Sequence, residues 1–207
     1  MAGDDCPGLA ETVLLIGVFH GDEPEGEVLI HKLMEEMEIV TSLPMGTPHN
    51  DIGRILFIPC LCPDGKELKT RTNANGVDLN RNFPTQNWAL SGEKDIYYSG
   101  DSPASEIETR FLMEVIEEFE PARILAIHAP YKVVNFDGPA QELAREMSEL
   151  NGYPVQEHIG YATPGSFGTY VGIERNIPTI TLELPENECI EKLWEDNREA
   201  FYYFLNL

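Results

Sequence analysis

The chain alternates between short apolar runs and longer stretches in which apolar residues recur at helical spacing. The apolar runs have the length of β-strands and cover residues 13–19, 54–60, 123–127 and 178–184. The helical stretches cover residues 24–39, 103–119, 139–150 and 188–205, and a further short helix is expected at residues 167–175. Strands that alternate with helices predict an α/β sandwich around a largely parallel sheet. The length of 207 residues fits one domain, residues 1–207.

Residues typical of helix ends flank two of the predicted helices. Ser102 is placed to cap the helix at 103–119, and Gly152 is placed to end the helix at 139–150. Residues 61–102 are rich in glycine, asparagine, aspartate and proline and carry no regular pattern. An irregular segment of this length is uncommon in a compact domain unless it has a function.

The net charge excludes several classes of partner. The chain has 14 lysine and arginine residues against 36 aspartate and glutamate residues, a formal charge of −22. Nucleic acid would be repelled, and docking on anionic lipid is disfavoured for the same reason. No apolar run reaches the ~18 residues of a membrane span, and the first residues lack the basic start and apolar core of a secretory signal. We therefore expect a cytoplasmic protein without a nucleic-acid or membrane partner; the sequence leaves the oligomeric state open.

The cysteine pattern points to reduced thiols. Cys6, Cys60, Cys62 and Cys189 could form two bridges, but a chain of this length does not need them. Cys60 and Cys62 could also bind a metal. We favour the simpler interpretation of two thiols at a strand end.

Reactive residues follow the predicted strands. His20 comes after the first strand with Glu23 three residues later, and His128 comes after the third. Ligand sites in parallel sheets lie beyond the carboxyl ends of strands. Two imidazoles and a carboxylate, with a fourth position open to water, are a common ligand set of catalytic zinc. Taken singly, His20-x-x-Glu23 is weak evidence for a metal site, and His128 could instead be a strand-end histidine that is satisfied by a hydrogen bond inside the fold.

Glu183 lies within the last apolar strand. A carboxylate there is costly to bury unless it is paired or protonated. It could act as a general base whose pKa is raised by partial burial, or it could form a salt bridge or face solvent on an edge strand.

The irregular segment holds two of the scarce cations. Arg71 and Arg81 lie there, and Asn80 precedes Arg81. Arginine binds carboxylates with two parallel hydrogen bonds, so this pair indicates recognition of an anion. The alternative is that both side chains satisfy backbone carbonyls or surface acids.

Taken together, these motifs resemble the zinc metallocarboxypeptidase family. The resemblance extends from about residue 13 to 185 and, within the family, is similar to a compact bacterial group of murein peptide amidases. It rests on segments that occur in the family's order: His20-x-x-Glu23, Pro63-Asp-Gly65, Arg71-Thr-Asn-Ala-Asn-Gly76, Gly76-Val-Asp-Leu-Asn-Arg-Asn-Phe-Pro84, Trp88, His128, Gly160-Tyr-Ala-Thr-Pro-Gly-Ser-Phe-Gly168 and Thr181-Leu-Glu-Leu184.

The resemblance implies a fold, a cofactor and a role for each residue. The fold would be a single-domain α/β/α sandwich with a mixed, largely parallel central sheet, and the cofactor one Zn²⁺ per chain. The roles would be zinc ligation by His20, Glu23 and His128; general base and acid for Glu183; oxyanion stabilisation for Arg71; binding of the substrate's terminal carboxylate by Asn80 and Arg81; and closure over the substrate by Tyr161.

The resemblance also implies a small peptide substrate. It would be the murein tripeptide L-Ala-γ-D-Glu-meso-diaminopimelate, cut between D-glutamate and diaminopimelate during cell-wall recycling. Asp137 is a candidate for binding the side-chain ammonium of diaminopimelate. The alternatives are an N-acyl-amino-acid deacylase of the succinylglutamate desuccinylase and aspartoacylase type, a carboxypeptidase of broader specificity, and a silent peptide-binding module on the same fold.

Overall fold

The described strands form one mixed sheet. The structure, a computed structural model, describes residues 11–41, 54–92, 95–158 and 160–206. The strand order in the sheet is β2-β1-β3-β6-β4-β5, and the pair β4–β6 is antiparallel while all other neighbours are parallel. The strands are β1 (Thr12–Ile16), β2 (Arg54–Ile58), β3 (Arg123–His128), β4 (Tyr131–Asp137), β5 (Val155–Gln156) and β6 (Thr179–Pro185).

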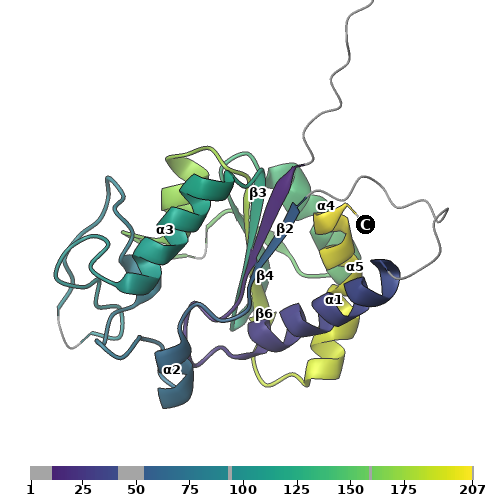
Figure 1. Ribbon diagram of the computed structural model, residues 1–207, viewed down its shortest axis with the longest axis horizontal. Coiled ribbons are helices and arrows are strands. Elements are labelled where there is room, and N and C mark those ends of the chain that lie inside the picture. Colours follow the sequence, from purple (N-terminus) through teal and green to yellow (C-terminus); the bar gives the residue numbers. More distant parts are fainter. Residues whose placement is uncertain (1–10, 42–53, 93–94, 159, 207) are drawn as a thin grey trace, which may run out of the picture.

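Helices cover both faces of this sheet (Figure 1). Figure 1 shows α1, α4 and α5 on one face, and α3 with the long irregular segment on the other. None of the described helices is long and apolar enough to cross a membrane. The helices are α1 (Glu25–Thr41), α2 (Pro63–Leu68), α3 (Ile107–Phe119), α4 (Gln141–Asn151) and α5 (Ile190–Leu205), with the short turns η1 (Leu79–Arg81) and η2 (Thr169–Ile173).

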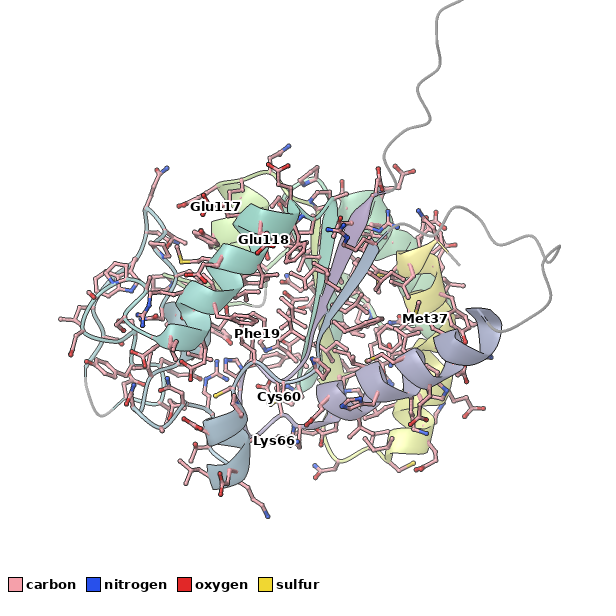
Figure 2. All side chains as sticks on the ribbon, in the orientation of Figure 1. Phe19, Met37, Cys60, Lys66, Glu117 and Glu118 are labelled. Atoms are coloured by element: carbon pink, nitrogen blue, oxygen red, sulfur yellow. The ribbon has the colours of Figure 1, made fainter. Side chains whose placement is uncertain are left out.

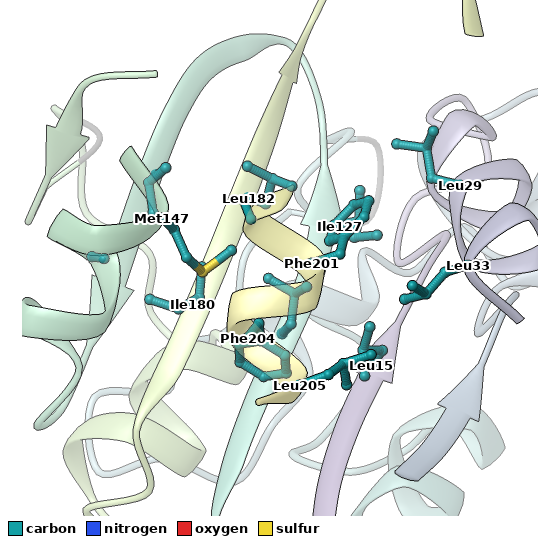
Figure 3. Close-up of a cluster of buried hydrophobic side chains, with 14 of the residues drawn as sticks. Leu15, Leu29, Leu33, Ile127, Met147, Ile180, Leu182, Phe201, Phe204 and Leu205 are labelled. Carbon is teal, nitrogen blue, oxygen red and sulfur yellow. The ribbon is translucent and has the colours of Figure 1, made fainter. Parts of the chain in front are cut away.

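Burial on both faces explains why the parallel strands are continuously apolar. Leu15 packs against α1 and α5, while its neighbour Leu14 packs against α3 on the opposite face. Figure 3 shows the cluster on the side of α1 and α5, which contains Leu15 of β1 together with Leu33 of α1 and Phe204 of α5. Strands buried on both faces have this composition. Truncating Leu15 to alanine would cost about 2–5 kcal/mol.

The predicted α/β/α sandwich is confirmed, and its four predicted strands and four main helices are present. The prediction did not include β4 and β5. In β4, Val134 and Phe136 enter the apolar cluster, whereas Asn135 and Asp137 lie at a cavity on the other face. Because apolar and polar residues alternate in β4, the strand contains no long apolar run, and a prediction based on such runs does not find it. Because β4 is antiparallel to β6, it makes the sheet mixed.

The beginning of α3 corrects a second prediction. The helix begins at Ile107 with Glu106 as its N-terminal flanking residue, so the expected start at 103 with a Ser102 cap is wrong. The side chain of Asn82 donates to the carbonyls of Ser99 and Ser102, and Ala104 adopts a left-handed φ of 55°. These contacts hold the chain in a turn before the helix.

Two other helical predictions agree in position. Gly152, with φ 71°, ends α4 as expected. The short helix expected at residues 167–175 is the π-helical turn η2. The irregular segment also contains α2 and η1, which the prediction left out.

Candidate active site

Three side chains converge beyond the carboxyl ends of β1 and β3. His20 Nδ1 lies 2.9 Å from Glu23 Oε1, and His128 Nδ1 lies 3.1 Å from Glu23 Oε2. The two histidine Nδ1 atoms are 3.3 Å apart. Both histidines are buried, with 2% and 4% of their surface exposed. Among the described residues, these three form the group able to hold a metal ion.

The spacing of this triad fits zinc. A tetrahedral ion with bonds of ~2.0–2.2 Å holds its ligand atoms roughly 3.3 Å apart, and the observed separations are 2.9–3.3 Å. Burial opposes the charged form of His20, but Glu23 and Asp78 outweigh it and raise the pKa of His20 to about 9. Burial opposes ionisation of Glu23 too, yet the two histidines hold its pKa well below the usual range. The triad therefore keeps a carboxylate available as a ligand.

Asp78 is a site residue that the sequence did not reveal. Its buried carboxylate lies 3.1 Å from His20 Nε2 and accepts a 2.9 Å hydrogen bond from Arg71 Nε. A carboxylate on the outer nitrogen of a ligating histidine fixes its ring and tautomer. Asp78 also accepts from the backbone of Asn80 at the start of η1. A capping role is the ordinary explanation for an aspartate in such a loop, so its second role had no sequence signal.

Phe19 packs against one histidine of the triad. Its ring stacks on that of His128 at a centroid distance of 5.1 Å and an interplanar angle of 24°. Phe19, labelled in Figure 2, is fully buried in the cluster that includes Leu112 of α3. The hydrophobic layer thus restrains the orientation of His128.

Glu183 lies on β6 directly opposite His128 of β3. Only 6% of its surface is exposed, and among the described residues it forms no salt bridge. The backbone of Tyr131 donates to the carboxylate, but Oε2 is buried without a hydrogen-bond partner. Burial raises the pKa of Glu183 above its ordinary value. Both structural alternatives, a salt bridge and solvent exposure, are therefore wrong for this residue.

The loop residues Arg71, Asn80 and Arg81 line the same cleft as the triad and Glu183, a space of about 780 Å³. Asn80 Oδ1 accepts from the backbone N–H of Phe167, which fixes its carboxamide. The guanidinium groups of Arg71 and Arg81 lie 5.0 and 5.4 Å from the ring centre of Tyr97. Tyr97 is a further residue that the sequence did not reveal, because nothing in its local pattern links it to the arginines.

Tyr161 lies at the edge of this cleft with 44% of its surface exposed. Burial of part of the side chain and a hydrogen bond with Tyr131 raise the pKa of Tyr161 to about 12, so its hydroxyl keeps its proton. Its closure over a substrate stays a prediction.

Asp137 lies apart from the triad, in a second cavity of about 110 Å³. This cavity adjoins the cleft, because Asn80, His128, Tyr161 and Glu183 line both. Burial raises the pKa of Asp137 to about 6.

The predicted thiols are not part of this site. Cys60, Cys62 and Cys189 are free, and Cys6 lies outside the described residues. Burial raises the pKa of Cys62 to about 12, so this thiol is inert.

Comparison with known proteins identifies the family. The zinc carboxypeptidase family model matches residues 7–200, and the chain belongs to this family. It is therefore a hydrolase of the metallopeptidase class, as the sequence motifs predict.

Within this family, the chain is similar to several murein peptide amidases. The chain is 33% identical over 196 residues to murein peptide amidase A of Escherichia coli K12, covering 88% of this chain and 76% of the relative. It is 35% identical over 184 residues to murein peptide amidase A of Vibrio campbellii, covering 83% and 68%. The crystal structure of murein-tripeptide amidase MpaA from Escherichia coli O157 superimposes with a TM-score of 0.77 at 29% identity, covering 96% of this chain and 82% of that one.

Proposed function

We propose that this enzyme is a zinc-dependent murein peptide amidase. It hydrolyses the amide bond between γ-D-glutamate and the carboxyl-terminal diaminopimelate of L-Ala-γ-D-Glu-meso-diaminopimelate. The observation that carries the proposal is the unpartnered Glu183 Oε2 in the cleft that also contains the His20–Glu23–His128 triad. The choice of substrate is supported by the relatives named murein peptide amidase A.

The triad would hold the zinc ion, which lowers the pKa of water and polarises the scissile carbonyl. Glu183 Oε2 accepts the proton of the attacking water and later returns it to the nitrogen of the leaving amine. The raised pKa of Glu183 suits both transfers, because it lies closer to neutrality than that of an exposed carboxylate.

Arg71 stabilises the charge that develops on the carbonyl oxygen. Its Nε is engaged by Asp78, so the guanidinium is oriented before the substrate arrives. A preorganised donor contributes most where charge develops in the transition state. Asp78 thereby couples the orientation of Arg71 to that of His20.

Asn80 and Arg81 bind the carboxylate at the end of the substrate. The backbone carbonyl of Asn80 accepts from Arg81 Nη1, and η1 holds both residues at the cleft wall. Two donors on one carboxylate select the last amide bond of a peptide, so cleavage removes one residue.

The proposal is tested by incubating zinc-loaded protein with the tripeptide and following products by mass spectrometry. We expect release of free diaminopimelate that stops with chelator and is absent for Glu183→Gln. Release of acyl groups from short N-acyl amino acids instead would favour the deacylase. Equal release of unrelated carboxyl-terminal residues would favour a broader carboxypeptidase, and zinc binding without hydrolysis would favour a silent module.

The cytoplasmic location stays a prediction, as does the absence of nucleic-acid and membrane partners. Cell fractionation of the native host with an antibody against the protein tests the location. Activity recovered only from the soluble cytoplasmic fraction is the expected result.

A further inference from the structure

The guanidinium group of Arg81 is buried without a carboxylate beside it. Only 5% of the residue is exposed, and among the described residues Arg81 forms no salt bridge. Asp78 acts on it only from beyond salt-bridge distance, and Nη1 donates at 2.6 Å to the backbone carbonyl of Asn80. Burying a charge is costly unless another group compensates for it. Within the described part of the chain, that compensation comes from a group of another kind.

The ring of Tyr97 lies against this charge. The guanidinium carbon of Arg81 lies over the ring at 5.4 Å from its centre, and that of Arg71 lies over it at 5.0 Å. Both distances are within the ~6 Å at which the negative face of an aromatic ring attracts a cation. One ring therefore attracts both arginines of the cleft, to which the proposed function gives different tasks.

An aromatic ring leaves more of an arginine available to a ligand than a carboxylate does. A carboxylate on Arg81 would accept its N–H groups and neutralise its charge, so it would compete with the carboxylate of a substrate. A ring attracts the cation through its quadrupole and brings no negative charge into the site. The positive charge of Arg81 thus stays available in the cleft that Arg81 and Tyr97 both line.

Hydrogen bonds fix the turn that carries Tyr97. The carbonyl of Tyr97 accepts from Ser91 Oγ at 2.8 Å, and the next carbonyl, of Tyr98, accepts from the backbone N–H of Asp78 at 2.8 Å. The side chain of the same Asp78 accepts from Arg71 Nε at 2.9 Å. Because Asp78 holds both the turn and Arg71, the ring and this guanidinium are fixed relative to each other before a substrate binds.

We propose that Tyr97 is a positioning residue whose ring holds Arg71 and Arg81 in place for the substrate without a counter-ion. The inference rests on the proposed function, in which Arg81 binds the terminal carboxylate and Arg71 stabilises the charge on the carbonyl oxygen. The ring carries this role, and the hydroxyl has no part in it. Loss of the ring therefore weakens binding through Arg81 and slows the reaction through Arg71.

The test compares Tyr97→Phe, which keeps an aromatic ring, with Tyr97→Leu, which removes it. On L-Ala-γ-D-Glu-meso-diaminopimelate we expect Tyr97→Leu to raise KM about 5- to 30-fold and to lower kcat about 3- to 10-fold. Tyr97→Phe should keep both constants within about threefold of the unmodified protein. A similar loss in both variants would assign the effect to the hydroxyl and overturn the proposal, as would unchanged constants in Tyr97→Leu.

The matched control is Tyr203→Leu. Tyr203 lies on α5 outside the cleft, and its exposed fraction of 41% is close to the 38% of Tyr97. We expect this control to leave kcat and KM unchanged. Tyr97→Leu should still bind one zinc per chain, measured by elemental analysis after dialysis. Loss of the metal from Tyr97→Leu would mean a structural role for the ring and would overturn the proposal.

A binding measurement separates this inference from the proposed function. Calorimetry with zinc-loaded Glu183→Gln compares the tripeptide with the analogue whose terminal carboxylate, next to the bond to be cut, is an amide. Adding Tyr97→Leu should weaken the tripeptide about 5- to 30-fold and the amide less than about threefold, because only the tripeptide offers that carboxylate to Arg81. If the unmodified protein cleaves neither ligand but this difference holds, the proposed reaction fails and the role of Tyr97 stands. Equal weakening of both ligands overturns that role.

Discussion

Replacing Asp137 by asparagine should stabilise the protein, and the gain should depend on pH. Burial raises the pKa of Asp137 from its ordinary 3.8 to about 6. The folded protein therefore holds this proton more tightly than the unfolded chain does. Stability contributed by the protonated form is present at low pH and is lost as the pH rises through this interval. Asparagine has a similar shape and cannot ionise, so the variant avoids the loss.

The expected gain in stability follows from the ordinary and the raised pKa of Asp137. A pKa difference of this size corresponds to about 3 kcal/mol, since each pKa unit is about 1.4 kcal/mol. The carboxylate is only partly buried, so solvent screening reduces the penalty. We therefore expect Asp137→Asn to be more stable by about 1–2 kcal/mol at pH 8, with the difference vanishing towards pH 4.

Urea unfolding of the chelated proteins, followed by circular dichroism from pH 4 to 8, measures this difference. All other titrating groups are common to both proteins, so the change with pH isolates Asp137. An Asp137→Asn difference that stays constant, or that grows towards acid pH, would refute the reasoning.

Four other outcomes are expected. Asp78→Ala should weaken zinc binding about 10- to 100-fold in chelator competition; unchanged affinity would mean that Asp78 does not orient His20. Glu183→Gln should lower kcat by a factor of about 10² to 10⁴ while one zinc per chain remains bound; loss of zinc would indicate another role. Arg71→Lys should lower kcat about 10²-fold with little change in KM, and a change in KM alone would point to ground-state binding. Removing zinc should lower the melting temperature, since an ion at 100 times its Kd contributes about 2.7 kcal/mol; an unchanged melting temperature would place the ion outside the folded core.

The layers of the fold could be predicted from the sequence because the parallel strands are buried on both faces. Leu14 and Leu15 point to opposite clusters, and this produces the continuous apolar run that identifies β1. The sequence analysis missed β4 because only one face of this strand is apolar. Its polar side chains Asn135 and Asp137 line the second cavity on the other face. The start of α3 was misplaced because Asn82, more than twenty residues upstream, holds the preceding turn.

The site residues also fall into two groups, those that the sequence predicted and those that only the structure revealed. His20 and His128 follow strand ends, where residue type and position are enough to predict a shared site. Asp78 and Tyr97 act through contacts that only the folded irregular segment creates. Sequence patterns therefore predicted the three residues of the triad, and the fold was needed to find the groups that contact them and the second cavity.

The central claim is that one zinc ion, held by His20, Glu23 and His128, is needed for cleavage of the γ-D-glutamyl bond. Titrating chelated, dialysed protein with zinc, while measuring bound metal and released diaminopimelate in the same samples, tests it most directly. Both quantities should rise together and saturate at one zinc per chain, and His128→Ala should show neither. Diaminopimelate released before zinc is added, or full activity in His128→Ala, would contradict the claim.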